Sequence, residues 1–189
     1  MDIFREIEEA KIVPVVVIED AKDAVPLAKA MMKGGINIAE ITFRTSAAKE
    51  AIESICQNCP DMLVGAGTVL TIGQVDEAVN AGARFIVTPG SNPKVIKYCV
   101  DNNITIIPGC ANPSNVELAL ENGLSVVKFF PAEQAGGINY IKAISAPYGN
   151  VRFMPTGGIS PKNIENYLKE KCIILVYKLG GCFDRFIPS

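Results

Sequence analysis

The chain has 189 residues, of which 49% are hydrophobic and 20% charged, so it can bury a sizeable core and is too apolar to be disordered. Its formal net charge is −2, from 18 basic and 20 acidic residues with no long basic run, which argues against nucleic acid or a membrane surface as a partner. No apolar stretch reaches the roughly 18 residues of a bilayer span, and the acidic, mixed first residues do not resemble a signal or transit peptide. We therefore expect a cytoplasmic protein that forms one domain over residues 1–189.

The residue types restrict the chemistry. The sequence contains no His, which excludes His-based triads and His metal ligands. Cys56 and Cys59 are the one close pair among the 6 Cys, and a zinc site would normally need further Cys or His partners. We expect reduced thiols near a helix end, no metal, and acid–base catalysis by Glu, Asp, Lys or Tyr.

Short apolar or β-branched runs alternate with longer amphipathic segments along the chain. Because such runs are typical of strands buried on both faces of a parallel sheet, we predict a series of βα units. The predicted strands recur about every 20 to 26 residues and begin near Val13, Ile38, Leu63, Phe85, Thr105, Val126, Arg152 and Ile173.

The amphipathic segments carry the signals of helix boundaries. Residues 24–33 and 116–121 are examples of these segments. Several segments are followed by glycine, which favours the left-handed conformation that ends a helix, at Gly34-Gly35, Gly82 and Gly123. Several are preceded by a side-chain oxygen that can cap a helix, at Thr71, Asn92, Asn112 and Ser160.

Eight βα units predict a small (β/α)8 TIM barrel rather than an open doubly wound sheet. An open dinucleotide-binding sheet normally has a glycine-rich turn after its first strand, and residues 12–18 run into residues 19–23 without a glycine. The nearest match, at residues 65–67, follows the third strand and lacks the third glycine. In a barrel, catalytic groups lie at the carboxyl ends of the strands.

Lys128 is the most informative of these residues. Strand periodicity places it on one face with Val126 and Phe130. If that face lines the barrel, burial disfavours the charged ammonium, and a neutral amine can attack a carbonyl carbon to form a Schiff base. The alternatives are that Lys128 extends from the strand end to water, or that Lys178, the other strand-borne candidate, is the nucleophile.

The second strand ends in an acid, a hydroxyl and a guanidinium on one face. These groups are Glu40, Thr42 and Arg44, and burying them is costly unless they serve a ligand or one another. Glu40 could shuttle protons beside a substrate carbonyl, and Arg44 suits a planar carboxylate. A structural ion pair between Glu40 and Arg44 is the alternative.

Small residues follow several other predicted strands and could let backbone approach a ligand. They lie at residues 65–68, 88–90 and 108–113, and these signals are weak because turns need the same residues. Residues 154–161 end the seventh strand with Gly157 and Gly158, whose backbone could hold an anion before a helix. A plain tight turn is the alternative.

Taken together, these segments resemble the 2-keto-3-deoxy-6-phosphogluconate (KDPG) / 4-hydroxy-2-oxoglutarate (KHG) aldolase family. The resemblance extends from about Ile12 to about Lys171. Its motifs occur in the family's order and are Glu40-Ile-Thr-Phe-Arg44, Gly65-Ala-Gly-Thr-Val69, Phe85-Ile-Val-Thr-Pro89, Val127-Lys-Phe-Phe-Pro131 and Pro155-Thr-Gly-Gly158.

The resemblance implies a cofactor-free class I aldolase, a lyase that is usually a homotrimer and acts in carbohydrate metabolism, in the Entner–Doudoroff pathway. It makes Lys128 the Schiff-base lysine and Glu40 the general acid/base. The further residues that it places against substrate are Arg44 and Thr68 at the pyruvyl carboxylate, Pro89, Phe130 and Thr156 in the pocket, and Gly157 with Gly158 at the phosphate.

The sequence departs from the family pattern over residues 172–189. The eighth strand looks longer than usual, Cys182 stands after Gly180-Gly181 where a Ser is expected, and no helical pattern follows. We therefore expect an atypical or incomplete eighth βα unit. A catalytically impaired binder of pyruvate-like acids, and a Schiff-base lyase for an unphosphorylated sugar acid, are the alternative functions.

Overall fold

The computed structural model of the chain describes residues 3–174 and 176–179 and has the predicted alternation of strands and helices. The first seven strands begin within one residue of the predicted positions, and the eighth begins three residues later. The strands are β1 Ile12–Val16, β2 Ile38–Thr42, β3 Leu63–Gly67, β4 Phe85–Val87, β5 Ile106–Ile107, β6 Val126–Phe129, β7 Arg152–Pro155 and β8 Val176–Leu179.

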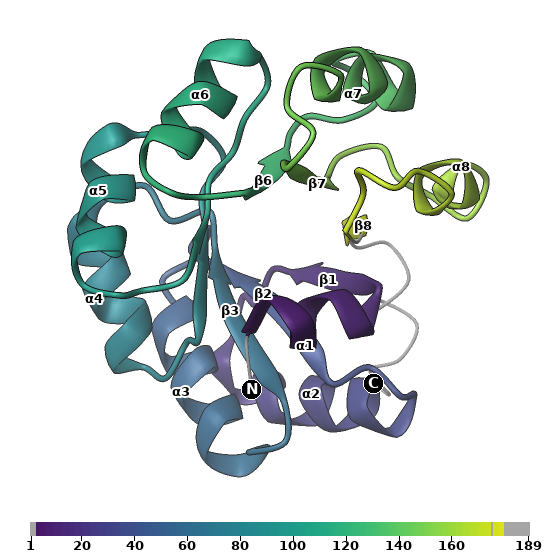
Figure 1. Cartoon of the computed structure of the whole chain (residues 1–189). Coiled ribbons are helices and arrows are strands. Elements are labelled where there is room, and N and C mark those ends of the chain that lie inside the picture. Colours follow the sequence, from purple (N-terminus) through teal and green to yellow (C-terminus); the bar gives the residue numbers. More distant parts are fainter. Residues whose placement is uncertain (1–2, 175, 180–189) are drawn as a thin grey trace.

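All paired strands are parallel and follow one another around a ring. Six form a sheet in the order β5-β4-β3-β2-β1-β8, and β6 pairs with β7. Backbone hydrogen bonds join the two sheets at β5 and β6, where Lys128 N donates to Pro108 O (2.9 Å) and Cys110 N donates to Lys128 O (2.7 Å). The fold is therefore the predicted (β/α)8 barrel (Figure 1).

The other junction of the ring corrects the prediction for the last strand. The expected single run from Ile173 is divided: Ile173 forms an isolated bridge to Phe153 of β7, and the strand β8 then pairs with β1 from Val176 onward. The segment thus contacts β7 first and β1 afterwards. The predictions for Gly180, Gly181 and Cys182 lie outside the described residues, and so does any helix after β8.

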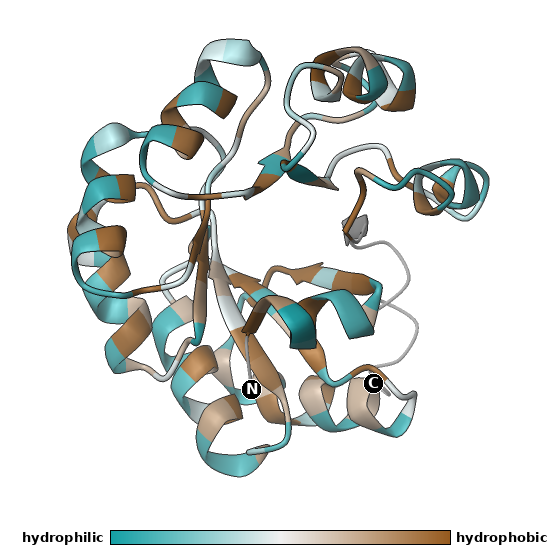
Figure 2. Ribbon diagram, in the orientation of Figure 1, coloured by the Kyte–Doolittle hydropathy of each residue, from teal (hydrophilic) through white to brown (hydrophobic). Residues whose placement is uncertain are grey.

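Helices follow the strands on the outside of the ring (Figure 1). The helices are α1 Ile3–Ala10, which precedes β1, and then α2 Ala24–Lys33, α3 Ala48–Asn58, α4 Ile72–Asn80, α5 Pro93–Asp101, α6 Pro113–Glu121, α7 Gly137–Ser145 and α8 Ile164–Leu168. A short 3-10 helix, η1, lies at Ala21–Asp23. Figure 2 shows that the strands are mostly hydrophobic, whereas the outer helices carry both hydrophobic and hydrophilic segments. This division is what a sheet covered by amphipathic helices requires.

The predicted capping residues act as expected in most places. Thr71 and Asn112 accept hydrogen bonds from the backbone of Gln74 and Asn115, respectively, at the starts of α4 and α6. Ser160 does not begin a helix, because the Asn163 side chain accepts the hydrogen bond from the Ser160 backbone (2.7 Å) and a turn intervenes. As a result α8 begins only at Ile164.

The helix α1, which the sequence analysis did not predict, closes the amino-terminal end of the barrel. Its Ile7 is fully buried in the cluster of side chains that fills the barrel interior, together with Phe85 and Val126. Glu6 and Glu8 of the same helix form ion pairs with Arg84 (3.1 Å) and Arg152 (2.9 Å). This end of the barrel is therefore filled by apolar packing and held by surface ion pairs.

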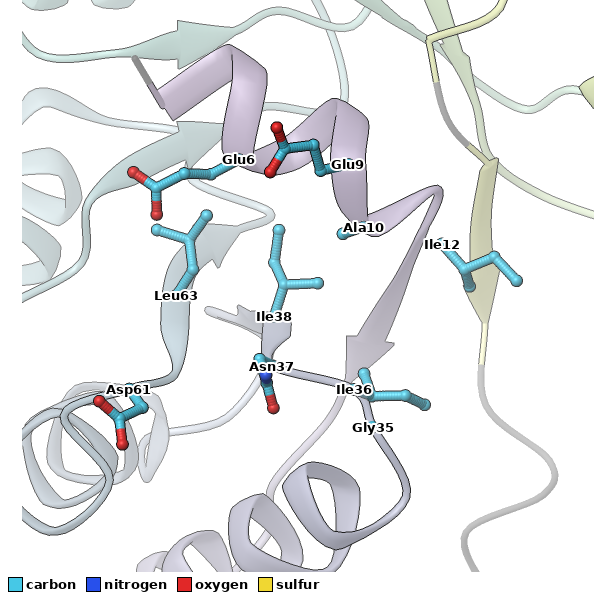
Figure 3. A pocket seen from close by; sticks show the side chains of 10 residues that line it. All are labelled: Glu6, Glu9, Ala10, Ile12, Gly35, Ile36, Asn37, Ile38, Asp61 and Leu63. Carbon is cyan, nitrogen blue, oxygen red and sulfur yellow. The ribbon is translucent and has the colours of Figure 1, made fainter. Parts of the chain in front are cut away.

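A pocket of about 470 Å³ lies beside α1 at that closed end. Figure 3 shows Glu6, Glu9 and Asp61 around it, with Ile38 and Leu63 at the starts of their strands. Glu6 and Glu9 are already paired with Arg84 and Arg5, and no Lys or Arg is among the described residues that line the pocket. The pocket therefore offers no positive charge to an anionic ligand such as a keto acid or a phosphate. The pocket therefore does not suit the substrates that the sequence predicts.

Among the residues that the structure describes, no helix combines the length and the apolar character needed to cross a bilayer.

Candidate active site

The buried polar and charged side chains gather at the opposite end of the barrel. In the described part of the chain they all lie in the last residues of a strand or directly after it, and they are Glu40, Thr42, Thr88, Lys128 and Thr156. Because a buried polar group is costly without a partner or a ligand, this concentration marks the carboxyl ends of the strands as the candidate site.

Lys128 shares a face with Val126, as strand periodicity predicted, and this face, whose direction the sequence left open, lines the barrel. Its neighbour on the same face, Val126, belongs to the cluster in the barrel interior, whereas Val127 packs outward under the helices. The Lys128 side chain is only 5% exposed, so it does not extend to water. Lys29 and Lys97, by contrast, lie exposed on the outer helices α2 and α5. The side chain of Lys178 lies outside the described part.

Glu40 is the ionic partner of Lys128 across the barrel. The Lys128 Nζ lies 3.6 Å from Glu40 Oε1, and the Glu40 side chain is fully buried. The alternative in which Glu40 serves Arg44 is not what the described residues form, because Arg44 Nε donates to Thr68 Oγ1 (3.2 Å). A carboxylate and an amine at this distance can exchange protons after small movements of either side chain.

Gly67 provides the space that the Glu40 carboxylate occupies. A Cβ atom at Gly67 would lie 1.8 Å from Glu40 Oε1 and 2.4 Å from its Cδ. On the same face of β3, a Cβ at Gly65 would lie 2.2 Å from the ring of Phe85. The inward face of β3 therefore accepts a carboxylate from β2 and a ring from β4 in the places of its two missing side chains.

Thr68 has an unusual backbone conformation at the end of β3. Its φ is 55°, in the left-handed region that a β-branched residue rarely adopts. Such conformations cost about 1–3 kcal/mol and concentrate at functional sites. Here the conformation accompanies the hydrogen bond from exposed Arg44, which uses one of the five donors of the guanidinium.

Phe130 and Pro89 lie at the carboxyl ends of β6 and β4. The Lys128 Nζ is 5.6 Å from the centroid of the half-buried Phe130 ring, within the range of a cation–π contact. A Cβ at Gly109 would lie 2.1 Å from the carbonyl oxygen of half-buried Pro89, so the loops after β4 and β5 are packed closely. Both residues thus border the barrel end that contains Lys128.

The Thr156 hydroxyl can donate and accept a hydrogen bond and does neither with the residues that the structure describes. It is buried at the end of β7, and its Oγ1 has no hydrogen-bond partner among the described residues. Met154, two residues before it, packs in the barrel interior. Periodicity therefore directs Thr156 to the same side as Lys128, where a ligand hydroxyl could satisfy it.

Gly157 and Gly158 follow Thr156 with φ values of +103° and +75°. A Cβ at Gly158 would lie 2.6 Å from the Cβ and Cγ atoms of Glu133, so only glycine fits there. The predicted helix start directly after this turn is corrected by the late start of α8 at Ile164. Any anion held here would contact the glycine backbone rather than a helix end.

The sequence did not predict the hydrogen bonds that join neighbouring strand ends through threonine hydroxyls. Thr88 Oγ1 donates to Gly90 O (2.7 Å) and accepts from Gly109 N (3.4 Å), and Thr42 Oγ1 donates to Val16 O (3.0 Å). These partners are distant in sequence or specific to one loop geometry. The only signal for them was a hydroxyl at the end of each strand.

No group of three or more Cys, Asp or Glu side chains that could hold a metal ion occurs within residues 3–174 and 176–179. The described cysteines, which are Cys56, Cys59, Cys99, Cys110 and Cys172, are all free.

The barrel and its buried lysine–carboxylate pair together define a class of protein, a (β/α)8-barrel enzyme of the Schiff-base type. Comparison with known proteins narrows this class. The family model described as KDPG and KHG aldolase matches residues 3–183. The 2-dehydro-3-deoxy-phosphogluconate aldolase of Haemophilus influenzae is 52% identical over 166 residues, which is 88% of this chain and 78% of that protein. The KHG/KDPG aldolase of Escherichia coli is 42% identical over 165 residues, 87% of this chain and 78% of that protein.

A solved structure shows the same similarity in three dimensions. The KDPG aldolase of Legionella pneumophila, with pyruvate captured as a covalent carbinolamine intermediate, has a TM-score of 0.90 and 41% identity and covers 94% of this chain and 86% of that chain. The chain belongs to the KDPG and KHG aldolase family, and it is a carbon–carbon lyase.

Proposed function

We propose that this chain is a class I aldolase that cleaves 2-keto-3-deoxy-6-phosphogluconate to pyruvate and glyceraldehyde 3-phosphate, and 4-hydroxy-2-oxoglutarate to pyruvate and glyoxylate. The observation that carries the proposal is the Lys128 amine, buried inside the barrel 3.6 Å from the Glu40 carboxylate. The names of the relatives at 42–52% identity support the substrate class.

The reaction begins with attack of the neutral Lys128 amine on the C2 ketone. The resulting carbinolamine loses water to give an iminium ion, with Glu40 supplying the proton that leaves as part of the water molecule. Glu40 then removes the proton of the C4 hydroxyl. The C3–C4 bond breaks, its electron pair moves toward the iminium nitrogen, and the aldehyde leaves.

An enamine of pyruvate remains on Lys128. Protonation at C3 by Glu40, directly or through water, regenerates the iminium ion, and addition of water releases pyruvate and the free amine. Every proton in this sequence passes between the substrate, the Lys128 amine, water and one carboxylate. The scheme is therefore compatible with a sequence that contains no His.

The remaining site residues would orient the substrate. Arg44 and Thr68 suit the pyruvyl carboxylate, since both are already joined by a hydrogen bond at the end of β2 and β3. The buried, unsatisfied Thr156 hydroxyl suits a substrate hydroxyl. We place a substrate phosphate at the backbone of Gly157 and Gly158. This turn follows β7, the strand that pairs with β6, which carries Lys128.

Steady-state cleavage tests this function. Pyruvate release from 2-keto-3-deoxy-6-phosphogluconate, from 4-hydroxy-2-oxoglutarate and from an unphosphorylated sugar acid is measured. The assay is made with the parent chain, with Lys128→Met and with Lys97→Met. Lys128→Met preserves length and volume but removes the nucleophile, whereas Lys97 lies exposed on α5 and is the matched control. We expect turnover by the parent and the control only.

The same assay decides among the alternatives. Turnover of an unphosphorylated sugar acid alone would favour a Schiff-base lyase for such acids, and pyruvate binding without turnover would favour a catalytically impaired binder. Retained activity in Lys128→Met would remove Lys128 from its role and point to Lys178.

We further propose a homotrimer, on the basis of the family resemblance and of large apolar side chains that are at least a third exposed, which include Val17, Leu70 and Ile72. Light scattering of the purified chain would measure its mass. The cytoplasmic location and the single domain over residues 1–189 stay predictions.

A further inference from the structure

The loop after β6 runs alongside the end of β7 and brings a carboxylate next to the Gly157–Gly158 turn. Ala132 N donates to Thr156 O (2.7 Å), and Glu133 N donates to Gly157 O (3.1 Å). These bonds extend the β6–β7 pairing beyond both strands. The Glu133 side chain consequently begins directly over Gly158. A Cβ atom added to Gly158 would lie only 2.6 Å from the Cβ and Cγ atoms of Glu133.

The Glu133 carboxylate is turned away from that glycine by a tyrosine. Tyr167 of α8 is only 1% exposed, and its hydroxyl donates a hydrogen bond to Glu133 Oε1. Burial, together with this bond to a carboxylate, raises the pKa of Tyr167 above its usual value of 10.0, so the hydroxyl remains a donor at neutral pH.

The amino terminus of α7 supports the same orientation. A Cβ at Gly137, the first residue of α7, would lie 3.1 Å from Glu133 Oε1 and 3.3 Å from the Tyr167 hydroxyl. The carboxylate therefore lies at the positive end of a nine-residue helix, where negative charge is favoured. Gly137 leaves the space in which the carboxylate and the hydroxyl meet.

We propose that Tyr167 is a positioning residue for substrate specificity: it holds the Glu133 charge away from the Gly157–Gly158 turn, so that this turn can accept a phosphate. The inference rests on the proposed function, which places the phosphate at that turn. Without the Tyr167 hydroxyl, the carboxylate is free to rotate over Gly158 and repel a phosphate dianion. Schiff-base formation at Lys128 does not require the pair.

Tyr167→Phe tests the proposal, because it keeps the buried ring and removes only the hydroxyl. We expect KM for the phosphorylated substrate to rise about threefold to tenfold, as expected for an interaction felt in binding. KM for 4-hydroxy-2-oxoglutarate and covalent trapping of pyruvate by borohydride should not change. Adding Glu133→Gln to this variant removes the released charge and should return KM for the phosphorylated substrate toward the parent value.

Tyr148→Phe is the matched control. Tyr148 OH donates to Glu117 Oε1 (2.9 Å), so this variant also removes a tyrosine–glutamate hydrogen bond but at a site built by α6 and the segment after α7. Both KM values should remain at the parent level. A general loss of stability would appear in both variants as a lower melting temperature, whereas the substrate-selective change should appear only in Tyr167→Phe.

Several outcomes would overturn the proposal: equal KM changes for both substrates, no change in Tyr167→Phe, or a double variant as impaired as the single one. If Tyr167→Phe does not fold, Glu133→Gln alone decides, since a raised KM for the phosphorylated substrate would show that the charge is useful there. Failure of the parent chain to trap pyruvate or to cleave either substrate would instead reject the proposed function, so the two failures are distinguishable.

Discussion

Glu40 has two neighbours that set what its carboxylate can do. The Lys128 amine lies 3.6 Å away, and the absent side chain of Gly67 leaves the space for the carboxylate itself. A carboxylate held this close to the proposed nucleophile can serve each proton transfer in turn. The chemistry of this carboxylate and the space at Gly67 can each be tested by one substitution.

The first concerns the chemistry of the carboxylate. Glu40→Gln keeps the shape of the side chain but removes its ability to accept a proton. We expect kcat to fall by about 10²- to 10⁴-fold with a much smaller change in KM, because positioned proton transfer is usually worth that much. A kcat within a few-fold of the parent would mean that Glu40 is a structural partner and that water transfers the protons.

The second concerns the space at Gly67. Gly67→Ala would displace the Glu40 carboxylate, and a displacement of about 1 Å from the reacting atoms can cost about 10²-fold in rate. Gly73→Ala is the control, since its Cβ would be 3.9 Å from the nearest atom, Thr71 Oγ1, in helix α4. Equal kcat values in steady-state assays of the two variants would show that the Glu40 position is not critical.

Among the helices, α1 closes the amino-terminal end of the barrel through the buried side chain of Ile7. Ile7→Ala removes a fully buried side chain from the interior cluster and should lower the free energy of unfolding by about 2–5 kcal/mol. Leu120→Ala, on the outer helix α6 where the side chain is 38% exposed, should change it far less. Urea denaturation of both variants measures the difference. A small loss for Ile7→Ala would mean that α1 is dispensable to the core.

Elements could be predicted where the signal is local. The strand starts at Ile38 and Leu63 follow from β-branched and apolar runs, and Thr71 and Asn112 cap helices through their own side-chain oxygens. The start of α8 could not be predicted from Ser160, because a side chain three residues later takes its backbone hydrogen bond. Ile3 and Ile7 carried a helical spacing that could have revealed α1.

The sequence could predict which residues belong to the candidate site, but not which of their side chains are in contact. Strand periodicity predicted which residues share a face with Lys128 and with Glu40, but it left open whether those faces point into the barrel. That the two side chains meet, that Gly67 makes room for one of them, and that Tyr167 bonds to Glu133 depend on which strands and loops become neighbours in space. No local pattern encodes those distances.

At the scale of the whole molecule, polarity is divided between the two ends of the barrel. The amino-terminal end is filled by apolar side chains of α1 and the strands, and the carboxyl end gathers the buried hydroxyls, the carboxylate and the amine. The apolar packing at the amino-terminal end therefore supports the end where we propose that the chemistry occurs. The buried thiols packed under the helices make this stability depend on pH.

Burial raises the pKa of Cys110 to about 12 and that of Cys99 to about 11, where Asp76 adds to the effect, from a usual value of 9.0. Because the folded state keeps these protons longer than the unfolded state, stability is fully present below pH 9.0 and falls as pH rises toward the folded values. Between its unfolded and folded pKa, each thiol lowers the free energy of unfolding by at most about 1.4 kcal/mol for each unit of pH increase.

Urea denaturation from pH 8 to pH 11 checks this prediction. The free energy of unfolding of the parent should fall across that range, and Cys99→Ala/Cys110→Ala should fall less steeply even though it is less stable at pH 8. Parallel curves for the parent and the double variant would show that the thiols do not contribute to the alkaline loss.

The measurement that tests the central claim most directly is reduction with borohydride in the presence of pyruvate, followed by peptide mapping. We predict one added pyruvyl group, reduced to a stable secondary amine, on Lys128, and no addition in Lys128→Met. An adduct on another lysine such as Lys178, or no adduct on a chain that still cleaves the substrate, would contradict it.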